Sequence, residues 1–340
     1  MPIEQVVAAL TSPLLRSQGF MYPAGQPATD QAKLGWALTV VASLVVIIIS
    51  ALLLVAVFRK RNGTTPVGQR TVDDARDDVM PTRQQATGMS AIYVGVAITT
   101  VVLVATFAST VAALVRTNRG VGAAAITIHV IAHQWWWEAR YDDGNPSHNF
   151  VTANELHIPV GSVVRLTLES PDVIHSFWIP ELAGKTDAIP GQQNVAWFQA
   201  TRTGEFRGQC AEYCGLQHAH MASVVFADSA SIYEQWAMAQ RHLANTPTDS
   251  TARIGQQVFL RSCGACHAVR GTDALGVLGP DLTHLASRNS IGAGVRPNTT
   301  ENLRAWIRDA QAIKPGVQMP PMILPSGDMS AVVHYLESLR

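Results

Sequence analysis

Two long runs without any charged residue constrain this chain most strongly, at residues 34–58 and 88–115. A bilayer core is about 30 Å thick, and about 20 apolar residues cross it as a helix because each residue rises by about 1.5 Å. A buried helix of a soluble protein seldom stays uncharged for so long. The sequence therefore predicts two transmembrane helices, in a chain of 340 residues that is long enough for further domains.

Basic residues predict how these helices lie in the membrane. The tail before the first run carries only Arg16 and Lys33, whereas the connecting segment carries six basic residues: Arg59, Lys60, Arg61, Arg70, Arg76 and Arg83. Short loops rich in Lys and Arg stay in the cytoplasm. We therefore expect the connecting segment inside the cell and both termini outside.

Between residues 123 and 227 the pattern changes to short runs typical of strands. Three runs are rich in β-branched residues and partly alternate, with Gly and Pro at the turns between them: residues 125–132, 162–168 and 194–200. Such a region favours an antiparallel Greek-key sandwich or barrel.

Four soft metal ligands lie within twelve residues of this all-β region: Cys210, Cys214, His218 and Met221. Thiolates, imidazoles and a thioether select copper over magnesium, calcium or manganese. His175 offers a second imidazole, and two cysteines four residues apart can bridge two metal ions. The sequence therefore predicts a binuclear copper centre that passes single electrons. A disulfide or a lone zinc site would leave the spacing of Met221 from His218 unexplained.

The other two cysteines form a motif of covalent haem attachment, Cys263-Gly-Ala-Cys266-His267. Two thioether bonds would hold the porphyrin, and His267 would be the proximal iron ligand. The opposite ligand is expected to be a methionine. Met319, which a proline follows, is favoured over Met322, which could belong to the core. A thioredoxin-like or zinc-binding motif would explain neither the adjacent histidine nor the later Met-Pro pair.

The last block, from residue 252 onward, is predicted to be small and helical. Gly255 and Phe259 lie four residues apart on a helix that leads into the haem motif. A terminal helix is expected after Asp328, which would be its N-cap. We expect these two helices to cross at the small residue and to close the haem pocket.

Five segments, taken in chain order, resemble subunit II of the haem–copper cytochrome c oxidases that carry a fused cytochrome c domain (caa(3)-type). They are His133-Gln-Trp-Trp-Trp-Glu138, Asp172-Val-Ile-His-Ser176, Gly184-Lys-Thr-Asp-Ala-Ile-Pro-Gly191, the copper loop Gly208–Val224 and the haem segment around Cys263–His267. The resemblance implies a two-helix transmembrane hairpin, an all-β cupredoxin-like Greek-key domain and an all-α class I cytochrome c domain. The expected membrane part consists of an external segment 1–33 and of spans 34–58 and 88–115, which are joined by a cytoplasmic loop 59–87. It is followed by a cupredoxin-like domain 123–227 that holds the binuclear copper centre CuA, a helix and linker 228–251 and a cytochrome c domain 252–340.

The resemblance also implies roles for single residues. The side-chain ligands of the family's binuclear copper centre, called CuA, match His175, Cys210, Cys214, His218 and Met221. Glu212 would lend its backbone carbonyl to copper, and its carboxylate to a magnesium ion at the boundary with subunit I. Trp135 matches the tryptophan through which electrons enter. Gly279-Pro280 matches the segment whose proline carbonyl accepts a hydrogen bond from the proximal histidine.

The implied function is that of subunit II of a terminal respiratory oxidase in a bacterial inner membrane, with both redox domains on the periplasmic side. Electrons would pass through haem c and CuA to subunit I, where O2 is reduced to water and protons are translocated. Expected partners are subunits I and III, the bilayer, and a cytochrome c or a quinol–cytochrome c reductase as donor, with no nucleic acid. Two alternatives stay open: a membrane copper-delivery or thiol-redox protein fused to a cytochrome c, and a membrane cytochrome whose β domain is only an interaction module.

The two outer domains carry opposite formal charges. Residues 123–227 hold ten acidic and five basic residues, a charge of −5, and residues 247–340 hold seven acidic and nine basic residues, a charge of +2. Opposite charges steer two surfaces toward each other, and a tether raises their effective concentration. We therefore expect the haem domain to dock on its own copper domain.

Overall fold

The structure is a computed structural model that describes residues 19, 21–58, 82–118 and 122–340, without the side chains of 82–87 and 118. It divides into two compact units, Lys33–Thr117 and a unit that combines residues up to Ala32 with Asn118–Arg340. The basic side chains that predict the membrane orientation, apart from Lys33, and most of the external segment 1–33 lie outside the described residues.

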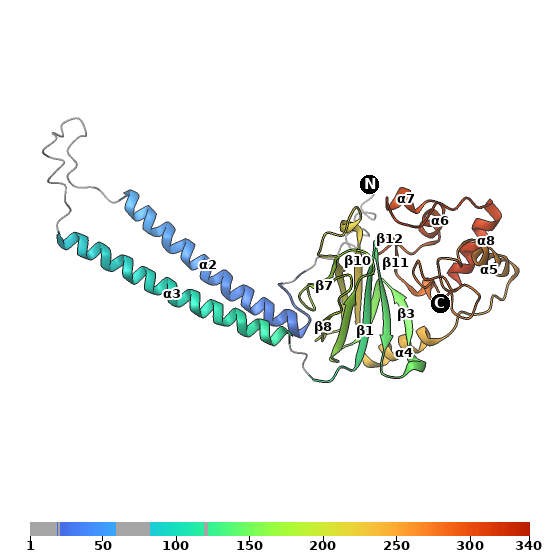
Figure 1. Cartoon of the computed structure of the whole chain (residues 1–340), viewed down its shortest axis with the longest axis horizontal. Helices are drawn as coiled ribbons and strands as arrows, with labels where there is room; N and C mark the ends of the chain where they lie inside the picture. The colour runs from blue at the N-terminus through green and yellow to red at the C-terminus, as the bar shows by residue number, and fades with distance from the viewer. Residues whose placement is uncertain (1–18, 20, 59–81, 119–121) are drawn as a thin grey trace, which may run out of the picture. The chain divides into compact units, whose positions relative to one another are not determined.

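Two helices, α2 (Gln26–Phe58) and α3 (Thr82–Asn118), contain the two uncharged runs (Figure 1). Both are long and apolar enough to cross a membrane, over Gln26–Phe58 and Gly88–Thr117. The helices begin before the expected spans, because backbone hydrogen bonding continues through polar residues. Thr29 marks such an extension of α2, since its hydroxyl donates to the carbonyl of Gly25 at 2.8 Å.

The β domain is a sandwich of a five-stranded sheet, ordered β3-β2-β1-β5-β8, and a three-stranded sheet, ordered β4-β10-β9, with a separate β6–β7 pair. Its strands are β1 (Ile126–His133), β2 (Trp136–Asp142), β3 (Phe150–Ala153), β4 (Glu155–Pro159), β5 (Val164–Glu169), β6 (His175–Phe177), β7 (Thr186–Ala188), β8 (Asn194–Phe198), β9 (Gly204–Gln209) and β10 (Ala222–Asp228). Alternate residues of β5, Val164, Leu166 and Leu168, are fully buried, as the period of a strand requires. The expected all-β domain is confirmed.

The sheets are mixed, so the expectation of a purely antiparallel sandwich is wrong. β1 pairs with β5 in parallel, and β10 pairs with β4 in parallel. The chain passes from the first sheet to the second between β3 and β4 and then returns to the first. Parallel neighbours need such a crossover between them, whereas a tight hairpin makes an antiparallel pair.

The segment around Ala24 and Gly25, which is far from the strands in sequence, contacts the sandwich and completes it. The backbone N–H groups of Ala24 and Gly25 both donate to the carbonyl of Glu181, at 2.7 and 2.9 Å, and the N–H of Thr201 donates to the carbonyl of Ala24 at 2.7 Å. A Cβ atom at Gly25 would lie 2.1 Å from the carbonyl oxygen of Leu182, so only glycine fits there. Nothing in the local sequence predicts this contact.

The C-terminal domain is helical, with one short hairpin of β11 (Ser290–Ile291) and β12 (Arg296–Pro297). Its helices, which follow α4 (Ala230–Arg241), are α5 (Ser250–Ser262), α6 (Thr300–Arg308), α7 (Ala310–Ile313) and α8 (Ser326–Glu337). α5 and α8 lie side by side (Figure 1), and they cross where predicted, because a Cβ at Gly255 would lie 2.0 Å from the carbonyl oxygen of Ala331. The predicted N-cap is wrong: α8 has Pro325 as its N-cap, and Asp328 lies in the first turn, where a carboxylate also favours the helix dipole.

Candidate copper and haem sites

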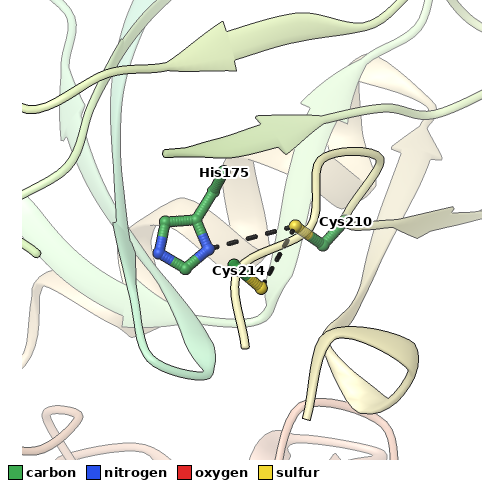
Figure 2. A group of neighbouring side chains, drawn as sticks. All are labelled: His175, Cys210 and Cys214. Carbon is green, nitrogen blue, oxygen red and sulfur yellow. Dashed lines mark hydrogen bonds between the residues drawn. The ribbon is translucent and has the colours of Figure 1, made fainter. Parts of the chain in front are cut away.

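Soft donor atoms from two separate segments converge at one point of the β domain. His175 begins β6, and Cys210 and Cys214 lie in the loop that joins β9 to β10. The two sulfur atoms are 3.8 Å apart, and Nδ1 of His175 lies 3.9 Å from Sγ of Cys210 (Figure 2). A disulfide needs about 2.05 Å between its sulfurs, so these thiols are not bonded to each other.

The rest of the predicted copper set joins the same cluster. Sγ of Cys214 lies 3.7 Å from Nδ1 of His218 and 3.9 Å from Sδ of Met221, which is fully buried. The backbone carbonyl of Glu212 lies 3.3 Å from Sγ of Cys210. Two thiols in the middle, with an imidazole on either side, a thioether and a carbonyl, are a donor set that fits a pair of copper ions.

Asp172 orients the first histidine, a role that the sequence analysis missed although the residue lies in one of the quoted motifs. Its carboxylate accepts a hydrogen bond from Nε2 of His175 at 2.8 Å, which leaves Nδ1 free to face the sulfurs. Burial alone would raise the pKa of Asp172, but this bond and those from the backbone N–H groups of Val173 and Gln134 lower it to about 2. Burial would lower the pKa of His175, and the bond to Asp172 raises it instead.

The pKa values of the two thiols are shifted in opposite directions. The hydrogen bond between the two thiols lowers the pKa of Cys210 to about 3, with His175 acting in the same direction. The same bond, together with burial, raises the pKa of Cys214. One sulfur is therefore ready as a thiolate, and binding of the second requires release of a proton, as metal sites commonly do.

We expect Asp172→Ala to lower the affinity for copper by about 10–100-fold, because the residue that holds a metal-binding histidine in place contributes about that much. The measurement is copper retention against a chelator of known affinity. Asp142→Ala, at the end of β2, is the control and should keep the affinity. Equal retention in all three proteins would contradict the role of Asp172.

Trp135 lies against the copper loop. Its ring nitrogen donates to the carbonyl of Cys214 at 3.0 Å, and the side-chain amide of Gln134 donates to the same oxygen at 2.7 Å. Gly215 has a φ of 114°, and a Cβ there would lie 3.1 Å from the Trp135 ring. The loop therefore carries glycine where the indole packs on it.

The carboxylate of Glu212, which the resemblance relates to magnesium, is exposed and forms an ion pair with Lys185 at 3.2 Å. A cation at this carboxylate would have to compete with that lysine. Magnesium binding stays a prediction.

The haem motif has the geometry that a proximal histidine needs. Nδ1 of His267 donates to the carbonyl of Pro280 at 2.9 Å, which is the bond that the resemblance implies and which leaves Nε2 free for iron. A Cβ at Gly279 would lie 2.5 Å from the imidazole, so the ring packs directly on this glycine. Burial lowers the pKa of His267, which favours the neutral imidazole that binds a metal.

The segment after the motif lies against it, since a Cβ at Gly276 would be 2.3 Å from the carbonyl carbon of Cys266. Its apolar side chains Leu275, Val277 and Leu278 are 71–80% exposed, which suits an apolar ring held by the two cysteines. Met322 packs partly on the helical core, whereas the backbone carbonyl of Met319 accepts a bond from Gln311 at 3.0 Å. The choice of Met319 as the second iron ligand stays a prediction.

Two parts of the chain match known families. Residues 145–228 match the family described as cytochrome C oxidase subunit II, periplasmic domain, and residues 252–340 match cytochrome c. The cytochrome c oxidase subunit 2 of Alkalihalophilus pseudofirmus is 40% identical over 222 residues, which cover 65% of this chain and 63% of that protein. The protein of the same name from Bacillus subtilis is 32% identical over 228 residues, 64% of this chain and 63% of the relative. The chain thus covers less than two thirds of either relative.

A solved structure is also similar to the chain. The periplasmic domain of subunit II of the cytochrome oxidase of Bradyrhizobium japonicum is 33% identical, with a TM-score of 0.34, and the match covers 36% of this chain and 96% of that one.

Proposed function

Since the chain joins a periplasmic domain of cytochrome c oxidase subunit II to a cytochrome c domain, we propose that it is the subunit that admits electrons to a haem–copper oxidase. Its two apolar helices and its periplasmic-domain relatives make it a membrane protein with an outer-side domain. The observation that carries the proposal is the convergence of two sulfurs 3.8 Å apart with imidazole nitrogens and a thioether.

In this proposal the copper pair is bound by the side chains of His175, Cys210, Cys214, His218 and Met221 and by the carbonyl of Glu212. Haem c is bound by Cys263, Cys266, His267 and Met319. When bound, these groups would supply one-electron transfer, which no amino-acid side chain of this cluster performs on its own.

The chain's own residues keep the site rigid and dry. His175 and Met221 are fully buried, and Cys210 and Cys214 are almost so. Asp172 holds one imidazole, and Gln134 and Trp135 hold the carbonyl of Cys214. Ligands that are fixed by such hydrogen bonds change little between two charge states, which keeps the cost of reorganisation low.

We further propose that electrons leave for subunit I, where oxygen is reduced to water and protons are translocated, and that subunit III belongs to the same assembly. A cytochrome c or a quinol–cytochrome c reductase would be the donor. The location would be a bacterial inner membrane with both termini and both redox domains outside. The carboxylate of Glu212 would bind magnesium at the boundary with subunit I only after its ion pair with Lys185 has opened.

The test is the metal content and electron paramagnetic resonance spectrum of the purified, oxidised full chain. We expect about two copper atoms per haem, since the donor set suits two soft ions, and the multiline hyperfine pattern of one unpaired electron shared by two copper nuclei. A single copper with its own simpler pattern would favour a copper-delivery or thiol-redox protein. A haem protein without copper would favour the β domain as a mere interaction module.

A further inference from the structure

The haem domain contacts the β domain beside the predicted copper ligands. The backbone N–H of Ala222 donates to the carbonyl of Ala293 at 3.1 Å, and the side chain of Gln217 donates to the carbonyl of Pro315 at 2.7 Å. Both donors belong to the β domain, and each is the immediate sequence neighbour of a predicted copper ligand. Two loops of the haem domain therefore lie on the copper loop.

Lys314 is buried at this contact, with 1% of its surface exposed. Its ammonium donates to the carbonyl of Trp135 at 2.7 Å, across the interface, and to the carbonyl of Gly292 at 2.8 Å, within the haem domain. Burial lowers its pKa to about 7, and both the ammonium and the amine keep N–H donors for the two carbonyls. Two residues later, a Cβ at Gly316 would lie 3.5 Å from the Trp135 ring.

Glu155 makes the corresponding contact from the β domain, since its carboxylate binds groups of the haem domain. It is 5% exposed, and its two oxygens accept three bonds from the haem domain. One oxygen accepts from the N–H of Asn289 at 3.0 Å, and the other accepts from the N–H and the hydroxyl of Ser290 at 2.8 and 2.9 Å.

Both charges find partners in the neighbouring domain, and most of those partners are backbone groups. A charge that is removed from water must be compensated by hydrogen bonds of good geometry, so each residue restricts the other domain to one position. The expected attraction between the oppositely charged domains stays a prediction, whereas these contacts are short-range and directional.

We propose that Lys314 and Glu155 are positioning residues that fix how the haem domain docks on the copper domain. Lys314 begins the loop that leads to Met319, and it bonds to Trp135, whose ring bonds to Cys214. The docked arrangement therefore connects the loop of the predicted iron ligand to the loop of a predicted copper ligand. The importance of this docked arrangement for electron transfer rests on the proposed function. The docking of the two domains does not depend on that function.

The test uses the full chain in detergent, with Lys314→Met and Glu155→Gln as variants. Methionine keeps the length of the lysine side chain and removes its donors. Glutamine keeps the shape of Glu155 but turns an NH2 group toward a backbone N–H. Glu169→Gln, on β5, is the matched control. Hydrogen exchange is followed at the amide of Ala222, which bonds across the interface, and at the amides of α8, which report folding of the haem domain.

We expect exchange at Ala222 to accelerate about tenfold or more in both variants, because bonds to charged groups are among the stronger ones. Exchange in α8 and in the control protein should not change. The rate of electron transfer from haem to copper should fall about tenfold, since bond loss loosens the arrangement, while the haem potential and the copper spectrum stay constant. Unchanged exchange at Ala222, or an equal acceleration in α8, would overturn the positioning role. Accelerated exchange in a protein that binds no copper would support the docking and sink the proposed function.

Discussion

Cys214→Ser is expected to remove the proposed binuclear copper signal and to leave the proposed covalent haem in place. Sγ of Cys214 is the central atom of the cluster, since it lies within 3.9 Å of the sulfur of Cys210, the nitrogen of His218 and the sulfur of Met221. Serine has nearly the same shape but offers a hard oxygen, which copper in this soft site does not favour. We expect copper to fall from about two atoms per haem to about one or none, and the proposed transfer of electrons from haem to copper to fall to background.

Cys263→Ser is the matched control for that variant. It makes the same exchange in the haem motif, so it should weaken covalent haem attachment and keep the copper spectrum. Copper is measured by resonance spectroscopy and metal analysis, and attached haem by gel staining of the denatured chain. A copper pair that survives Cys214→Ser would contradict the assignment of the site.

Gly255→Ala should destabilise the haem domain severely. The added methyl group would lie 2.0 Å from the carbonyl oxygen of Ala331 and 2.6 Å from its carbonyl carbon. Both are backbone atoms of α8, so α5 and α8 would have to move apart. Overpacking of this kind costs about 3 kcal/mol, which for a domain of this size lowers the melting temperature by about 12 °C or more.

Gly327→Ala is the control for the helix crossing. Gly327 lies in the first turn of α8, and a Cβ there meets no atom within 4 Å. Alanine should therefore stabilise the domain by about 0.5–1 kcal/mol, because it loses less backbone entropy. Thermal unfolding of the full chain, followed by the absorbance of its haem, measures both variants. A similar melting temperature for Gly255→Ala and the unchanged protein would show that the helices do not cross as described.

The candidate metal ligands can be selected from the sequence because their signal is chemical and local, and the structure brings them together. Cysteine, histidine and methionine at fixed spacing have few other uses, so Cys210 to Met221 could be recognised without a fold. His175 is remote, and its position beside the sulfurs follows only from β6. The uncharged runs likewise identify α2 and α3, although not the residues at which these helices begin.

Contacts to backbone atoms are beyond such prediction. Lys314 binds the carbonyl of Trp135, 179 positions away, and Glu155 binds the N–H of Ser290, 135 positions away. Almost every residue has a backbone carbonyl and an N–H group, so the sequence does not distinguish the residues that serve as partners. The mixed pairing of the sheets was missed for a similar reason, because the order of strands depends on where the chain crosses between the layers.

The contact of Ala24 and Gly25 with Glu181 and Thr201 affects how the outer region can be produced on its own. A recombinant version that starts at Gly122 would lack Ala24 and Gly25. The carbonyl of Glu181 and the N–H of Thr201, which bond to these residues, would then face water. An excised outer region therefore has to keep residues 22–28, spliced through a short linker to Gly122. For the same reason, if α2 spans a membrane as proposed, the sandwich can form completely only when Ala24 and Gly25 lie on the same side of that membrane as Glu181 and Thr201.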